Sequence, residues 1–263
     1  MRLDPRATAA GVRLIAHERL GSTNAEALDL ARKGERGPLW ITADHQSEGR
    51  GRRGRIWTSK RGNLHATLLL TDPGPAEHWP ELSFVAALAL HDAIVEIMPD
   101  LKPKLSIKWP NDLLISGEKF AGILIEGESV QKGAGEGSVA VGFGVNCTNH
   151  PKDTEYPATH LSAAGAKITA ARLFTVLGVK MLGRLAQWHG GEGFSTIRAD
   201  WLARVGGIGQ TLRVRLADRE LSGRFDTLDE DGRLVLTLAD GSRETVAAGD
   251  VVSITPSPGG GQS

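Results

Sequence analysis

Residues 105–127 read LSIKWPNDLLISGEKFAGILIEG, and this stretch decides the fold. Its apolar runs at 105–109, 113–115 and 120–126 have the length of strands and are separated by Pro-Asn-Asp and Ser-Gly-Glu-Lys. Turn residues between short apolar runs are typical of neighbouring antiparallel strands. A fourth run, 138–146, follows a glycine-rich turn (QKGAGEGS). Together the four runs predict a mostly antiparallel sheet.

Helices and further strands are expected on both sides of this stretch. Thr23, with Glu26 three residues later, fits a capping box at the start of a first helix that ends near Gly34. The spacing of apolar residues predicts three more helices, at 80–98, 169–188 and 194–205. Apolar runs predict three more strands, at 11–20, 39–43 and 64–71. We therefore assign the chain to the α+β class.

The pattern changes beyond Gly209. Residues 210–254 alternate with period two and are cut by Asp-Gly turns at Asp231 and Asp240. This alternating pattern, with its turns, predicts a small antiparallel barrel of about 45 residues. We expect a large domain over 1–207, the barrel over 208–256 and a flexible tail over 257–263.

Composition narrows the class of protein. The 263 residues are 40% hydrophobic and 24% charged, as in ordinary globular domains, and carry no formal net charge. Total charge therefore gives no support to bulk attraction toward DNA, RNA or an anionic membrane. The one cysteine, Cys147, excludes an intrachain disulfide and is expected to be a buried small hydrophobe. With no secretory signal and no apolar run near 20 residues, we expect a soluble cytoplasmic protein.

Residues 46–57, QSEGRGRRGRIW, form the most unusual loop of the chain. The run GRGRRG matches the dinucleotide fingerprint, but it lacks the strand before it and the helix after it that this fingerprint needs. Six cations lie between Arg50 and Arg61. Glycine exposes backbone N–H groups and arginine presents planar donors to phosphate or carboxylate, so an anion clamp is favoured. A small nucleic-acid stripe and a solvated charge run stay open as alternatives.

Two further motifs suggest ligand contacts. Lys108 to Asp112 (KWPND) is either a rigid structural turn or part of a site, and Lys119 is either a solvated lysine or a cation that joins the arginine loop. Residues 142–146 (GFGVN) place glycines alternately on a strand. Such a strand packs poorly unless a flat ring or a crossing element lies against its backbone. Asn146 offers both a donor and an acceptor to such a ring.

Taken in order, these motifs resemble the biotin protein ligase family. The resemblance rests on GSTN at 21–24, QSEGRGRRGRIW at 46–57, KWPND at 108–112, KFAGILI at 119–125 and GFGVN at 142–146. It implies a catalytic domain related to class II aminoacyl-tRNA synthetases and lipoate ligases, followed by an SH3-like barrel. It also implies that biotin and Mg-ATP give biotinyl-5′-adenylate and pyrophosphate. A lysine of a biotin carboxyl carrier protein then attacks the adenylate.

The same resemblance implies roles for individual residues. Those expected to contact biotin are Ser22, Thr23, Asn24, Gln46, Arg50, Gly51, Arg52, Lys119 and Gly122. Those expected to contact ATP or the adenylate are Arg50, Arg52, Arg53, Arg55, Trp57, Lys108, Asn111, Lys119 and Asn146. Joining a carboxylate to a triphosphate concentrates negative charge, so cations are needed there. Arg52 and Lys119 are the expected catalytic cations, with Asp112 as a third catalytic residue and a Mg²⁺ ligand.

Two alternatives and one departure accompany this interpretation. A lipoate or octanoate ligase has the same fold, and a nucleic-acid-binding protein could use the basic loop. Many bacterial relatives carry an N-terminal winged-helix repressor domain of about sixty residues, and here the GSTN motif begins almost at once. We therefore expect no repressor role and no specific DNA partner. A homodimer is possible, and the expected partner is the carrier domain of a biotin-dependent carboxylase.

Overall fold

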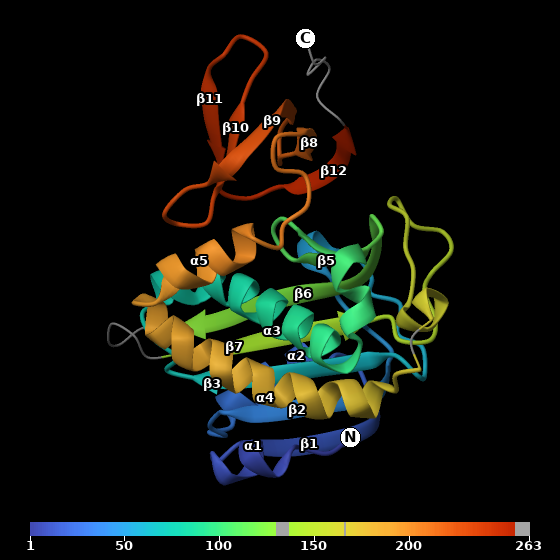
Figure 1. Ribbon diagram of the computed structural model, residues 1–263. Coiled ribbons are helices and arrows are strands. Elements are labelled where there is room, and N and C mark those ends of the chain that lie inside the picture. The colour runs from blue at the N-terminus through green and yellow to red at the C-terminus, as the bar shows by residue number, and fades with distance from the viewer. Residues whose placement is uncertain (130–136, 166, 256–263) are drawn as a thin grey trace.

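The computed structural model describes residues 1–129, 137–165 and 167–255. The predicted tail at 257–263 and most of the predicted glycine-rich turn at 131–138 lie outside these ranges. Figure 1 shows a large α+β part with the C-terminal β domain stacked on one side of it. Within the described ranges, no helix is long and apolar enough to cross a bilayer.

A seven-stranded sheet forms the centre of the large part. Its order is β1-β2-β3-β7-β6-β5-β4, and every neighbouring pair is antiparallel except β1 and β2. The strands are β1 Arg13–Leu20, β2 Leu39–Gln46, β3 Leu64–Thr71, β4 Leu105–Lys108, β5 Asp112–Ile115, β6 Glu118–Ser129 and β7 Gly137–Val145. The mostly antiparallel sheet predicted from the sequence is therefore confirmed.

Helices cover the two faces of this sheet unequally. One face packs against α3 and α4 through the main hydrophobic core, which includes Trp40, Leu68 and Phe143. Among the helices of the described ranges, α2 alone covers the other face, over a small cluster that includes Leu39 and Leu69. The helices are α1 Pro5–Ala9, α2 Thr23–Arg32, α3 Leu82–Ile97, α4 Ala170–Trp188 and α5 Phe194–Leu202. Because α2 covers only part of its face, the rest of that face can hold a ligand.

The helix boundaries correct several details of the sequence interpretation. Helix α2 is capped by Ser22 rather than Thr23, since the Ser22 hydroxyl accepts from the Ala25 amide at 3.5 Å. Thr23 is already the first helical residue, so its side chain is available for other contacts. Helix α1 was not predicted, and the predicted helix at 80–98 begins at Leu82 after a 3₁₀ turn, Ala76–Glu81. That turn contains Pro80, which removes a backbone donor.

The C-terminal domain is a five-stranded antiparallel sheet in the order β11-β10-β9-β8-β12. Its strands are β8 Thr211–Arg215, β9 Glu220–Leu228, β10 Leu234–Thr237, β11 Arg243–Val246 and β12 Asp250–Thr255. Gly232 and Gly241 take positive φ at the two predicted Asp-Gly turns. The small β domain is therefore confirmed.

The junction between the two parts lies beside β4 and β5. The Ile107 amide donates to the Arg204 carbonyl at 2.9 Å, so the linker runs along β4. The Trp109 indole donates to the Gly232 carbonyl at 3.1 Å, and the Lys108 ammonium lies 3.3 Å from the Val251 carbonyl. The KWPND motif therefore forms the turn that receives the C-terminal domain, and its structural interpretation holds alongside any role in a site.

Candidate active site

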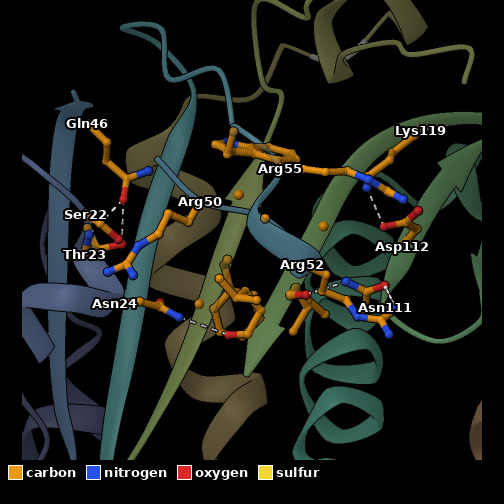
Figure 2. A pocket seen from close by; sticks show the side chains of 18 of the residues that line it. Ser22, Thr23, Asn24, Gln46, Arg50, Arg52, Arg55, Asn111, Asp112 and Lys119 are labelled. Carbon is orange, nitrogen blue, oxygen red and sulfur yellow. Dashed lines mark hydrogen bonds and ion pairs between the residues drawn. The ribbon is translucent and has the colours of Figure 1, made fainter. Parts of the chain in front are cut away.

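A pocket opens on the sheet face that carries α2. Figure 2 shows its labelled side chains converging from the start of α2, the end of β2, the arginine loop, and strands β5 and β6. Thirteen of the residues predicted from the sequence line it: Ser22, Thr23, Asn24, Gln46, Arg50, Gly51, Arg52, Arg55, Trp57, Asn111, Asp112, Lys119 and Gly122. The motifs therefore meet in one cavity.

One end of the pocket, called the neutral end, is lined by uncharged hydrogen-bonding side chains, with Arg50 and Glu126 beside them 3.9 Å apart as an ion pair. The Thr23 backbone N–H and hydroxyl both donate to Oε1 of Gln46, at 2.8 and 3.0 Å. The Thr67 hydroxyl on β3 lies 2.8 Å from the Thr23 hydroxyl and 2.6 Å from Oδ1 of Asn24. The Asn24 amide donates to Glu126 at 2.8 Å. These contacts fix which way each donor and acceptor points.

Thr67 and Glu126 belong to this end and were missed from the sequence. Thr67 lies in the apolar run LHATLLLT, where a buried polar residue is itself a signal that a partner must exist. Glu126 ends an apolar run and gave no comparable signal. Both act on Asn24 from strands that are far from it in sequence, at separations of 43 and 102 residues.

The alternate glycines of β7 are explained by side chains of the protein. A Cβ on Gly144 would lie 2.4 Å from the Trp57 indole, and a Cβ on Gly142 would lie 2.2 Å from Oδ1 of Asn24. The flat ring against this backbone is therefore the indole of Trp57. Because no side chain fits at Gly142 or Gly144, both Trp57 and Asn24 can reach the floor of the pocket.

The other end of the pocket is charged. Asp112 is 7% exposed, and its two carboxylate oxygens face Lys119 at 2.5 Å and Lys108 at 3.1 Å. Burial alone would raise the pKa of Asp112, but the two lysines outweigh it and hold this pKa below its ordinary value. Asp112 is therefore ionised at neutral pH. It holds Lys119 in place while that ammonium stays partly exposed to the pocket.

Asp112 does not fit the predicted Mg²⁺ site. Both of its oxygens already contact ammonium groups. A protein-bound Mg²⁺ needs free carboxylate oxygens. The sequence could not reveal this because the pairing of Asp112 with Lys119 depends on the register of β5 against β6.

The arginine loop crosses the charged end. The Arg52 guanidinium donates to Oδ1 of Asn111 at 3.3 Å and to the Gly249 carbonyl at 3.2 Å. It also lies 3.6 Å from the carboxylate of Asp250. Burial lowers the pKa of Arg52, partly offset by Asp250 and Asp112, but an arginine stays charged at any physiological pH. Asp250, on the C-terminal domain, also lines the pocket and was not predicted.

Three predicted residues lie outside this cavity. Arg53 points to Asp250, and Lys108 lies between Asp112 and the Val251 carbonyl. Asn146 is buried; its amide donates to the Thr159 carbonyl at 3.1 Å and accepts from Asn63 at 3.4 Å. Asn146 instead borders a neighbouring cavity that also contacts Trp57 and Lys119. A hydrogen bond from Asn146 to adenine would have to compete with both protein partners.

Cys147 is fully buried beside this region. Burial raises the pKa of its thiol to about 12, so it is protonated at neutral pH. Its expected character as a small buried hydrophobe is confirmed.

The fold and the pocket define a class of protein. The pocket lies on the open face of a mixed sheet, under an arginine loop. It has hydrogen-bonding groups at one end and cations at the other. This arrangement suits a ligase that activates a carboxylate with a nucleotide. The model of the biotin/lipoate A/B protein ligase family matches residues 17–146, and that of the biotin protein ligase C-terminal domain matches residues 207–252. The chain belongs to the biotin protein ligase family.

Individual relatives agree with this assignment. The chain is 38% identical over 242 residues to the biotin–[acetyl-CoA-carboxylase] ligase of Paracoccus denitrificans, covering 89% of this chain and 97% of the relative. It is 33% identical to the bifunctional ligase/repressor BirA of Bacillus subtilis, covering 90% of this chain and 73% of that protein. The biotin protein ligase from Aquifex aeolicus in complex with biotin and ATP has the same fold, with a TM-score of 0.77 at 24% identity over 93% and 99% of the two chains.

Proposed function

We propose that this chain is an ATP-dependent biotin ligase that forms biotinyl-5′-AMP and transfers biotin to a lysine of a biotin carboxyl carrier protein. One observation carries the proposal. Thr23, Asn24 and Gln46 offer oriented neutral donors and acceptors at one end of a pocket, and Arg52 and Lys119 offer cations at the other. Biotin has a neutral ureido ring at one end and a carboxylate at the other. The names of the relatives support the same substrate pair.

In the first step, the ureido ring lies at the neutral end and the carboxylate reaches toward Lys119. A carboxylate oxygen attacks the α-phosphorus of ATP, the bond from this phosphorus to the bridging oxygen of the β-phosphate breaks, and pyrophosphate leaves. Lys119 reduces the repulsion between the two anions, and Arg52 stabilises the charge that develops on the phosphoryl oxygens. Asp112 keeps the Lys119 ammonium at the pocket wall.

The loop and the indole protect the product of this step. A mixed anhydride hydrolyses when water reaches it, so exclusion of water is part of the chemistry. Trp57 packs on Gly144 of the floor, and the loop that carries it crosses the charged end through Arg52. We propose that this arrangement keeps water from the anhydride bond.

In the second step, the neutral amine of a carrier lysine attacks the carbonyl carbon of the adenylate. The bond from that carbon to the AMP oxygen breaks, an amide forms, and the proton lost from the amine passes to solvent. AMP leaves with the negative charge that Arg52 and Lys119 have stabilised.

We propose that the phosphates of ATP would hold the Mg²⁺ ion, which would supply neutralisation of their charge. This fits a pocket in which Asp112 is already engaged by two lysines. We further propose a carboxylase carrier domain as the acceptor and the cytoplasm as the location. A homodimer stays a prediction that sedimentation of the purified chain would check.

The test is ATP–pyrophosphate exchange with biotin and with lipoate in parallel reactions. We expect exchange that depends on biotin, and labelling of a carrier domain when biotin and ATP are both present. Exchange with lipoate and none with biotin would overturn the proposal in favour of the lipoate branch of the fold. Tight RNA binding that falls steeply with salt, without any exchange, would favour the nucleic-acid alternative.

A further inference from the structure

Asp250 of the C-terminal domain gathers three guanidinium groups of the arginine loop. Its carboxylate lies 2.5 Å from Arg55, 3.4 Å from Arg53 and 3.6 Å from Arg52. These residues are separated from it by about two hundred positions in the chain; the Arg55 contact spans 195 residues. The contact therefore joins two domains and not two neighbours on one element.

The surroundings of Asp250 make this contact stronger than an ordinary surface ion pair. Asp250 is 8% exposed and is the first residue of β12, where it pairs with Arg215 of β8. The residue before it, Gly249, accepts a hydrogen bond from Arg52 through its carbonyl. A buried carboxylate on a strand and an adjacent carbonyl form a fixed acceptor surface, whereas exposed pairs contribute little.

The charges at this contact do not cancel. One carboxylate faces three guanidinium groups, so the loop keeps a positive excess toward the pocket. Asp250 and Arg52 both line that pocket, and Arg52 also reaches Asn111 across it. The loop can thus attract a phosphate while Asp250 still holds the loop in place.

We propose that Asp250 is a positioning residue that anchors the arginine loop to the C-terminal domain and so presets Arg52 for the α-phosphate. The part that concerns phosphate rests on the proposed function. The anchoring of the loop does not depend on the proposed function and can be tested on the ligand-free chain. Without the anchor, the loop keeps its own turn, in which the Gly51 amide donates to the Arg55 carbonyl at 2.7 Å, but loses its position over the pocket.

The first test is limited trypsin digestion of the ligand-free protein, because trypsin cleaves after the arginines of this loop. We expect Asp250→Asn to speed cleavage after Arg52, Arg53 and Arg55 about tenfold, read by peptide mass. Arg55→Gln removes the shortest contact from the exposed side of the loop and should speed cleavage after Arg52 and Arg53 as well. If both variants are cleaved at the wild-type rate, Asp250 is not an anchor.

Asp226→Asn is the matched control. Asp226 is also a carboxylate of the C-terminal domain, and it pairs with Arg224 at 3.2 Å and Arg243 at 3.7 Å, away from the loop. It should leave cleavage of the loop unchanged. If it speeds cleavage as much as Asp250→Asn does, any weakening of this domain frees the loop and the specific anchor is refuted.

The second test separates positioning from general damage by kinetics. We expect Asp250→Asn to raise KM for ATP about tenfold while biotin affinity changes less than twofold, with partial recovery in Asp250→Glu. Equal losses of affinity for ATP and for biotin would overturn the proposal that Asp250 presets the position of Arg52. If the wild-type chain shows no exchange with biotin, the proposed function fails, whereas the digestion result still decides the anchor.

Discussion

The two ends of the pocket are built in different ways. The neutral end is held by short hydrogen bonds between Thr23, Gln46, Thr67 and Asn24, all of which lie on α2, β2 or β3. The charged end is held by ion pairs, with a loop on one side and the C-terminal domain on the other. Ordered neutral groups reject ligands that leave them unpaired, whereas cations attract any suitable anion. Under the proposed function, selectivity and reactivity lie at opposite ends of the pocket.

Lys119→Ala should have the largest effect of the substitutions considered, and this effect arises at the charged end of the pocket. Removal of one group that stabilises developing charge costs about 10²–10³ in rate, so adenylate formation should fall by this factor. Biotin affinity should fall much less. Pre-steady-state adenylate formation beside biotin titration measures the difference, with Lys180→Ala as control because Lys180 pairs with Glu96 on a remote helix surface. Equal losses in both would make Lys119 a binding group only.

Arg52→Gly should show that the same end also retains its product. We expect biotinyl-adenylate to dissociate about a hundredfold faster, a change of about 2.7 kcal/mol, and to react with bulk lysines. A filter assay of bound adenylate measures the rate. Arg61→Gly is the control, since Arg61 is an exposed arginine that follows the loop and lies outside the pocket. Unchanged dissociation in Arg52→Gly would contradict the clamp.

His65→Gln tests whether the burial of His65, beside the neutral end, makes the stability of the fold depend on pH. His65 lies on β3 two residues before Thr67, on the same face, and burial lowers its pKa to about 4. Between pH 6.5 and 4 the unfolded chain takes up a proton that the folded chain refuses, so stability falls as pH falls. At pH 5 this loss is about 2 kcal/mol.

We therefore expect the free energy of unfolding of His65→Gln to change less between pH 7 and pH 5 than that of the wild type, by about 2 kcal/mol. Urea melts at the two pH values measure it. A wild-type pH dependence that persists unchanged in the variant would place the titration elsewhere.

Thr67→Val should produce the smallest effect and only at the neutral end. It keeps the shape of the side chain but removes the hydroxyl that lies between Thr23 and Asn24. Loss of one oriented hydrogen bond costs about 1 kcal/mol, so biotin affinity should fall about fivefold while KM for ATP is unchanged. Thr175→Val on the exposed side of α4 is the control. An equal rise in KM for ATP would show that the two ends of the pocket do not act separately.

The sequence predicted this pocket well where a motif and its backbone coincide. Gln46, Arg52 and Lys119 lie in motifs that border strands, and the strands bring them together. Residues that act across the fold were not predictable in the same way. Asp250 lies in an alternating strand of a separate domain, so nothing local marks it as a partner of the loop.

Local pattern also failed where one residue type serves two purposes. Thr23 fits a capping box, yet Ser22 takes the cap because its extended backbone directs its hydroxyl to the Ala25 amide. Asp112 suits a metal site by residue type, yet the lysines of β4 and β6 occupy both of its oxygens. Strand register decided both the carboxylate's role and the lysines' positions, and register is set by contacts that a single sequence does not display.

The link from Arg55 to Asp250 also orders events during synthesis. The arginine loop leaves the ribosome 195 residues before its partner carboxylate, a delay of about 10–40 s at ordinary rates of translation. During that interval the nascent chain can complete the seven-stranded sheet, which ends at β7, while the loop still lacks its contact with Asp250. The last strand to be made therefore completes the pocket, and a chain that stops before residue 250 carries the motifs without their anchor.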